Sequence, residues 1–158
     1  MANTASLCTS FLSELMTGTH NFGVSPIRAA TTADTFKGAL YLASATINAS
    51  TTAYSATGEV SGTNYSAGGV TVTNATPPAS TNTSATAGTA YWTPSASLTY
   101  TNVTLTTAFD TMLMYNSTQS NKAVGVFTFG SQTITAGTFT LTMPSNTTST
   151  ALVRLATT

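Results

Sequence analysis

Residues 98–143, LTYTNVTLTTAFDTMLMYNSTQSNKAVGVFTFGSQTITAGTFTLTM, decide the fold of this chain. Their β-branched and aromatic residues fall in short runs separated by Asn, Ser, Gln and Gly, which is typical of strands joined by turns. The predicted strands are residues 98–105, 111–115, 123–129 and 138–143. Residues 116–121 form a hairpin-like connection, and Gly130 and Gly137 mark a loop before the last strand. The stretch therefore predicts three or four consecutive antiparallel strands.

Alternating side chains support this interpretation. Three apolar residues of the last strand alternate with threonines: Phe139, Leu141 and Met143. In residues 36–42 the apolar positions share one face, while Lys37 and Tyr41 take the other. Residues 70–76 and 151–155 are two further predicted strands. The sequence therefore predicts a mainly β chain folded as a single antiparallel β-sandwich.

One short helix is expected before the strands. Five apolar residues recur at helical spacing: Leu7, Phe11, Leu12, Leu15 and Met16. Thr4 or Ser6 can cap its start, and Gly18 suits its end. The expected organisation is an N-terminal helix or arm over residues 1–22 and a β-sandwich over residues 23–158. The apolar helix face must be buried either on this sheet or on a partner's.

Residues 76–97, TPPASTNTSATAGTAYWTPSAS, are predicted to be a long loop. Their composition is of low complexity, and Pro77, Pro78 and Pro94 exclude a regular central strand. Tyr91 and Trp92 are the exceptions to the polar composition. Either Trp92 plugs one end of the β core, or the pair is an aromatic anchor at a partner surface.

Composition excludes several partners. The chain has 158 residues, enough for one domain with a substantial core, and its formal net charge is zero. Charged residues make up 5% of it, against about a quarter in ordinary soluble domains, and roughly a third of the residues are Ser or Thr. No basic cluster points to nucleic acid, and no apolar run reaches the roughly 20 residues of a membrane span. A surface with so little charge is expected to self-associate.

The titratable residues offer little chemistry. Cys8 and His20 are the only thiol and imidazole, too few for a zinc site, and they are not expected to form a nucleophilic pair. The four carboxylates lie in separate segments: Glu14, Asp34, Glu59 and Asp110. Arg154 either pairs with Asp110 or Glu59 or faces solvent. We therefore expect no catalytic, cofactor-binding or metal site, and a protein that is not an enzyme.

Two stretches, residues 36–74 and residues 123–144, resemble a family of small structural proteins of tailed bacteriophages. The shared pattern is an F-K-x-A-L-Y strand, an A-Y-S-x-T-x-E-V segment, a Y-x-A-G-G turn and an A-V-x-x-F-x-F-G-S hairpin. These motifs begin here at Phe36, Ala53, Tyr65 and Ala123. In this family an N-terminal helix precedes the first motif, so the pattern as a whole spans most of the chain, and it carries no catalytic signature.

The resemblance implies a capsid cement or decoration protein with a jelly-roll-like sandwich. Such a protein would bind the outside of an icosahedral head, bridge neighbouring major capsid proteins of the HK97 type and occur as a homodimer or homotrimer. It would be assembled in the cytoplasm of a host bacterium and end on the outer surface of the virion. The alternative is a tail or head-fibre module that binds host-surface glycans. The residues expected to contact a partner are Leu7, Phe11, Leu15, Tyr91 and Trp92.

Overall fold

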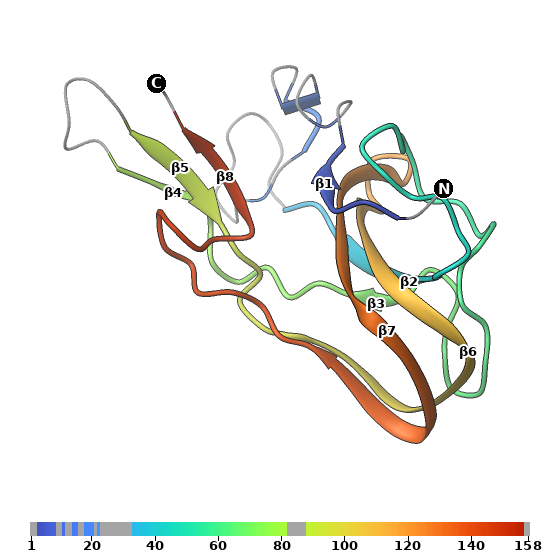
Figure 1. Cartoon of the computed structure of the whole chain (residues 1–158). Coiled ribbons are helices and arrows are strands. Elements are labelled where there is room, and N and C mark those ends of the chain that lie inside the picture. The colour runs from blue at the N-terminus through green and yellow to red at the C-terminus, as the bar shows by residue number, and fades with distance from the viewer. Residues whose placement is uncertain are drawn as a thin grey trace.

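The computed structural model describes residues 3–8, 11, 14–15, 18–20, 22, 33–81 and 88–156. The predicted mainly β fold is confirmed: the strands form two antiparallel sheets (Figure 1). The larger sheet has the order β1-β7-β6-β2-β3, and the smaller has the order β4-β5-β8. The strands are β1 (Ser6–Leu7), β2 (Phe36–Leu42), β3 (Val70–Thr71), β4 (Ala79–Ser80), β5 (Thr89–Trp92), β6 (Leu98–Asn116), β7 (Lys122–Leu141) and β8 (Val153–Ala156). The described residues include no helix that is both long and apolar enough to cross a membrane.

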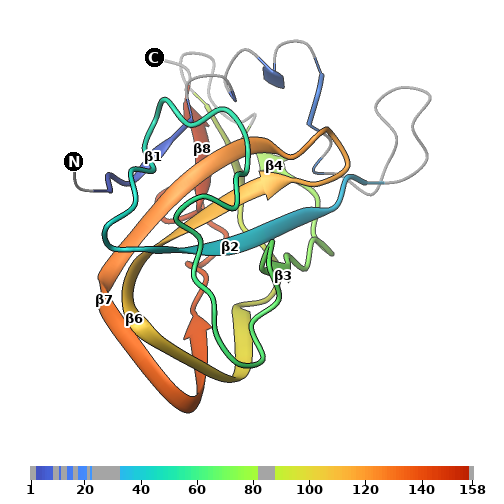
Figure 2. The same ribbon diagram turned by 90° about the vertical axis from the view of Figure 1, so that its right-hand side faces the viewer.

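A single long hairpin, β6–β7, replaces the four shorter strands that the sequence predicts. The expected connection at residues 116–121 is confirmed, but the loop expected between Phe129 and Thr138 is wrong because β7 runs through it. The pairing shifts register at five points along the hairpin, and two of these points lie beside Asn102 (φ 51°) and Ala136 (φ 46°), whose backbones are left-handed. Bulges of this kind bend a ladder without ending it. The hairpin accordingly curves back on itself (Figure 2).

The far half of β7 has one face toward the core and one toward solvent. Phe139 and Leu141 are half-buried, whereas Thr138 and Thr140 are exposed. The predicted alternation of apolar residues inward and hydroxyls outward is therefore confirmed here.

β2 matches its predicted bounds but is covered on both faces. Tyr41, which the alternation places on an outer face, is fully buried and donates a hydrogen bond to the carbonyl of Ser55. The segment that follows β2 returns along it: the amide of Val60 donates to the carbonyl of Leu40, and the hydroxyl of Tyr65 accepts from the Leu40 amide. The strand expected over residues 70–76 is only Val70–Thr71.

The N-terminal residues join the larger sheet, so the helix predicted to include Leu7 is wrong at that position. Leu7 lies in β1, opposite Gly125 of β7. Phe11, Glu14 and Leu15 have helical backbone, and Thr19 N donates to the Glu14 carbonyl. Leu12 and Met16 lie outside the described residues.

The loop predicted over residues 76–97 contains two strands, β4 and β5, so that prediction is wrong in part. β5 pairs with β8 along its whole length, with Trp92 opposite Val153. Pro77, Pro78 and Pro94 all lie just outside the strands, as proline's missing N–H requires. The sequence alone did not show that β8 would be the partner of this segment.

Candidate interaction site

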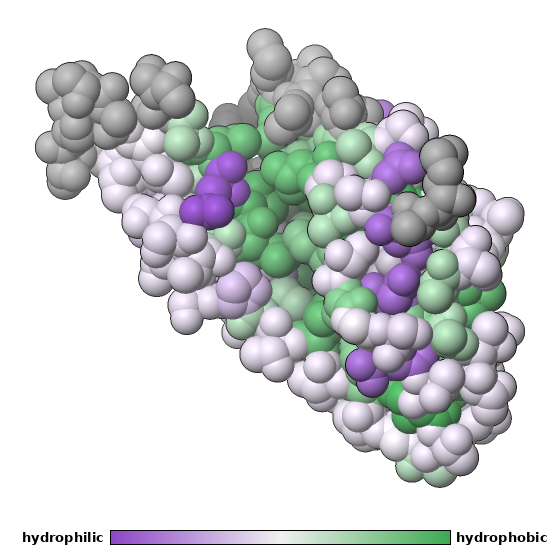
Figure 3. All heavy atoms as spheres, in the orientation of Figure 1, coloured by the Kyte–Doolittle hydropathy of each residue, from purple (hydrophilic) through white to green (hydrophobic). Residues whose placement is uncertain are grey.

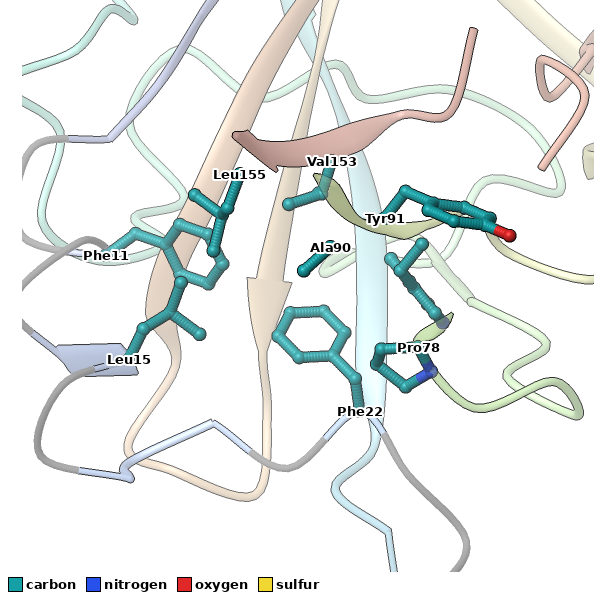
Figure 4. A pocket seen from close by; sticks show the side chains of 9 residues that line it. Phe11, Leu15, Phe22, Pro78, Ala90, Tyr91, Val153 and Leu155 are labelled. Carbon is teal, nitrogen blue, oxygen red and sulfur yellow. The ribbon is translucent and has the colours of Figure 1, made fainter. Parts of the chain in front are cut away.

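An apolar cleft lies between the N-terminal segment and the smaller sheet (Figure 3). Its volume is about 100 Å³. Phe11, Leu15 and Phe22 form one wall, and Val153 and Leu155 point into it from β8 (Figure 4). The other lining residues are Pro78, Ala90, Tyr91 and Trp92. Among these nine side chains only Tyr91 and Trp92 carry polar atoms, so the cleft suits apolar groups.

The structure brings four of the five expected contact residues together. Phe11, Leu15, Tyr91 and Trp92 line the cleft, while Leu7 lines a separate groove on the side of Arg154 and Ala156. Phe11 is 0% exposed and Trp92 is 2% exposed, so both already belong to the core of the chain. In this conformation both side chains line the cleft but offer little surface to a partner.

Trp92 is anchored from both ends. Its Nε1 donates to Oδ1 of Asn74 at 2.9 Å and to the carbonyl of Thr76 at 3.2 Å. Its ring meets Phe22 edge-on, with centroids 4.6 Å apart, and lies 6.2 Å from the ring of Phe36. Of the two readings of Trp92, the plug in the β core is the one that this burial matches.

A buried polar network lies behind the wall of the cleft. His20 Nε2 is 2.7 Å from Glu14 Oε2, and His20 Nδ1 is 3.1 Å from Asn116 Nδ2. Asn116 Nδ2 also donates to Asp34 Oδ2 at 2.6 Å, and Lys122 Nζ binds Glu14 Oε1 at 2.5 Å. Sequence reasoning missed this network, because Asn116 lies 96 residues from His20 and 82 residues from Asp34.

Burial and hydrogen bonding set the charges in this network. Burial lowers the pKa of His20, and the nearby Glu14 carboxylate opposes that shift only in part. Burial raises the pKa of Glu14, but hydrogen bonds from Lys122 and His20 outweigh it and hold the pKa below its usual range. At about pH 7 we therefore expect the contact between His20 and Glu14 to be a hydrogen bond from a neutral imidazole to a carboxylate.

Glu59 is held by tyrosines. Its carboxylate accepts hydrogen bonds from Tyr54 OH at 2.6 Å, from Tyr65 OH at 2.7 Å and from the Gly68 amide at 2.7 Å. Burial, together with the bond to Glu59, raises the pKa of Tyr54. Burial likewise raises the pKa of Tyr41 to about 12. These hydroxyls stay protonated as donors rather than serve as bases.

All four carboxylates of the chain are used inside the fold. Asp110 accepts from Asn3 Nδ2 at 2.8 Å and from the Thr111 hydroxyl at 2.7 Å, and the other three are bonded as described above. Arg154 pairs with none of them and donates to the Ser149 carbonyl at 2.7 Å. The proposed pairing of Arg154 with Asp110 or Glu59 is wrong, and its exposed position matches the alternative.

Cys8 is fully buried, and burial raises its pKa to about 11. A thiol in such surroundings is inert as a nucleophile. Within the part of the chain that the structure describes, no three His, Cys, Asp or Glu side chains gather as metal ligands would.

Sequence reasoning missed five of the lining residues: Phe22, Pro78, Ala90, Val153 and Leu155. The alternation of Val153 and Leu155 around Arg154 was the available signal, since it places both apolar side chains on one face of a strand. Phe22 and Pro78 gave no periodic signal.

No protein-family model matches this chain, and no curated protein or solved structure matches it.

Proposed function

We propose that this chain is a structural protein of a tailed-bacteriophage virion, a cement protein that binds the outer surface of the head and bridges neighbouring major capsid proteins. It acts through surface contact and carries out no reaction. The protein binds the assembled shell more tightly than the separate subunits, and this difference in affinity stabilises the shell by mass action.

The observation that carries this proposal is the internal use of every carboxylate. Glu14, Asp34, Glu59 and Asp110 all accept hydrogen bonds within the chain. The exposed surface then offers many hydroxyls, such as those of Thr99 and Thr101, and little charge to desolvate. Such a surface can be buried in a large assembly at low cost.

The apolar cleft is the contact site that we assign. Leu155 at its rim is 42% exposed and is the one large apolar side chain so exposed among the described residues. It sits beside Phe11 and Leu15, so an apolar side chain of the capsid could add to an existing cluster. Apolar anchors in preformed pockets dominate the energies of many interfaces.

A glycan-binding fibre module finds less support. Stacking on a sugar needs an exposed aromatic face, and Trp92 is buried against Phe22 and Phe36. Tyr91 is half-buried and stands without a second exposed aromatic ring in the cleft. Many copies per purified virion would favour the cement protein, and a few copies would favour the fibre.

Self-association into a dimer or trimer is part of the proposal, because a surface with few charged groups, whose carboxylates are hydrogen-bonded within the chain, does little to oppose it. Sedimentation of the purified protein at micromolar concentration tests this. A strict monomer would show that the protein does not self-associate in solution. Assembly on the capsid would then be tested by binding to particles.

Thermal release of the genome tests the cement function. Virions that lack the protein should release DNA at a lower temperature than complete virions, and added protein should restore the difference. Leu155→Asp should fail to restore it, whereas Thr140→Asp, which puts the same charge on β7, should succeed. If depleted particles hold their DNA as well as complete ones, the cement function is wrong. If the two variants behave alike, the cleft is not the contact site.

A further inference from the structure

The side-chain amide of Asn116 can adopt only one orientation. Its Oδ1 accepts hydrogen bonds from the amides of Thr118 and Gln119, at 3.1 and 3.2 Å, which closes the start of the β6–β7 turn. Its Nδ2 must then point the other way, toward Asp34 Oδ2 and His20 Nδ1. Asn116 is 0% exposed, and all four hydrogen-bonding positions of its amide are filled.

This orientation fixes the protonation state of His20. Because Asn116 Nδ2 is a donor, His20 Nδ1 has to be an unprotonated acceptor, and the ring proton lies on Nε2, facing Glu14. The side chain of His20 is 0% exposed, so no water replaces either partner. A second proton, on Nδ1, would put two N–H donors face to face.

Some groups around the ring favour the protonated form of His20, and others oppose it. Glu14, on the same segment, and Asp34, just before β2, attract a cationic ring, whereas Lys122 of β7 and burial oppose it. Turning the Asn116 amide would not relieve the clash, since its Oδ1 would then face the carboxylate of Asp34 and leave the turn amides without an acceptor. The ring itself has to move.

The ring of His20 packs against two phenylalanines of the cleft. The ring of His20 lies 5.0 Å from that of Phe11 and 6.3 Å from that of Phe22, and both phenylalanines line the apolar cleft. We propose that protonation of His20 releases this segment from the β6–β7 turn and opens the wall of the cleft, so that the docking surface is assembled at neutral pH and taken apart by acid. This inference rests on the proposed function for the role of the cleft, but the switch belongs to the free protein.

Nuclear magnetic resonance tests the starting state directly. The chain has one histidine, so its ring nitrogens give a single set of signals. At about pH 7 we expect a protonated Nε2 and an unprotonated Nδ1. A proton on Nδ1 at that pH, or titration of the ring at or above 6.5, its unperturbed value, would overturn the inference.

Fluorescence of Trp92, the only tryptophan, tests the opening, since its ring packs on Phe22. Between about pH 7 and about pH 5 its emission should shift to the red while the far-UV circular dichroism of the sheets is retained. His20→Gln, which keeps a donor toward Glu14 and has no titration, should show no shift over this range.

Three results would contradict the switch. One is titration of His20 without a change in Trp92 emission, another is an unchanged acid shift in His20→Gln, and the third is loss of the far-UV signal together with the shift, which is global unfolding. If His20→Gln fails to fold, the wild-type protein still provides two tests: whether Trp92 emission changes as His20 titrates, and whether the far-UV signal is retained. These measurements use the free protein without any capsid. If the protein responds to acid but does not protect particles against genome release, the proposed function is wrong and the switch stands.

Discussion

Trp92 is tied to Asn74 by a hydrogen bond of 2.9 Å from its indole Nε1 to Oδ1, and the same asparagine donates from Nδ2 to the carbonyl of Phe22 at 2.7 Å. One side chain thus joins β5 to the N-terminal wall of the cleft. Trp92 and Phe22 are held at their contact distance by a polar group as well as by packing.

Asn74→Ala should lower the free energy of unfolding by about 1–3 kcal/mol, because it leaves the Phe22 carbonyl without this donor and Trp92 with only the Thr76 carbonyl. Urea denaturation followed by Trp92 fluorescence measures it. Asn146→Ala, at an exposed asparagine, is the matched control and should stay within about 0.5 kcal/mol. Equal effects from the two substitutions would show that the Asn74 bonds contribute nothing.

Glu59→Gln should destabilise the chain by about 2 kcal/mol, because three donors lose a charged acceptor. Tyr54→Phe removes one of those donors and should cost about 1 kcal/mol, whereas Tyr91→Phe, outside this group, should be close to neutral. Urea midpoints of the three variants provide the comparison. An unchanged midpoint for Glu59→Gln would mean that the tyrosines bind it no better than they bind a neutral amide.

Gly69→Ala should cost about 3 kcal/mol, which thermal unfolding would detect as a large loss in Tm. The residue has φ +72°, and an added Cβ would overlap the carbonyl oxygen of Gly38 on β2. Gly130→Ala is the matched control, since its nearest neighbour would be 4.0 Å away and its φ lies outside the left-handed region. Similar Tm values for the two variants would contradict the close approach of residues 69 and 38.

Stability should fall as the solution is made more acidic than about pH 6.5. The folded pKa of His20 is lowered from 6.5, so the unfolded chain takes up the proton first and gains free energy from it. The loss reaches up to about 1.4 kcal/mol per pH unit until the folded pKa is passed. The lowered pKa of Glu14 adds a further loss as pH falls below about 4.5. Urea unfolding at several pH values measures this slope, which should vanish above about pH 5 in His20→Gln.

Local alternation predicted much of the larger sheet. β2 has its predicted bounds although both of its faces are covered. Phe139 and Leu141 face inward as expected, because a strand with one covered face has an apolar residue at every second position. The Y-x-A-G-G turn that begins at Tyr65 is present as well. Gly68, with φ +86°, lies in it, and its amide donates to Glu59.

Long-range pairing could not be predicted in the same way. β5 lies in a segment of low complexity and is a strand because β8 pairs with it, so the signal is in residues 153–156 rather than in β5 itself. Leu7 fits a helical pattern with Phe11 and Leu15, yet β7 offers it an open edge, and tertiary pairing overrides the local preference. The contact between His20 and Asn116 has no local signal in the sequence, because the two residues are 96 positions apart.

The internal use of all the carboxylates has a consequence for how the chain responds to salt. Counter-ions at physiological ionic strength screen exposed charges over about 8 Å, but here the acidic groups are bonded inside and few basic groups remain outside. Contacts made through the apolar cleft should therefore hold at low and high sodium chloride alike. Sulfate and other excluded salts should tighten them, since they strengthen the burial of apolar surface. A partner bound in this way can be removed by detergent or by mild denaturant more readily than by a salt wash.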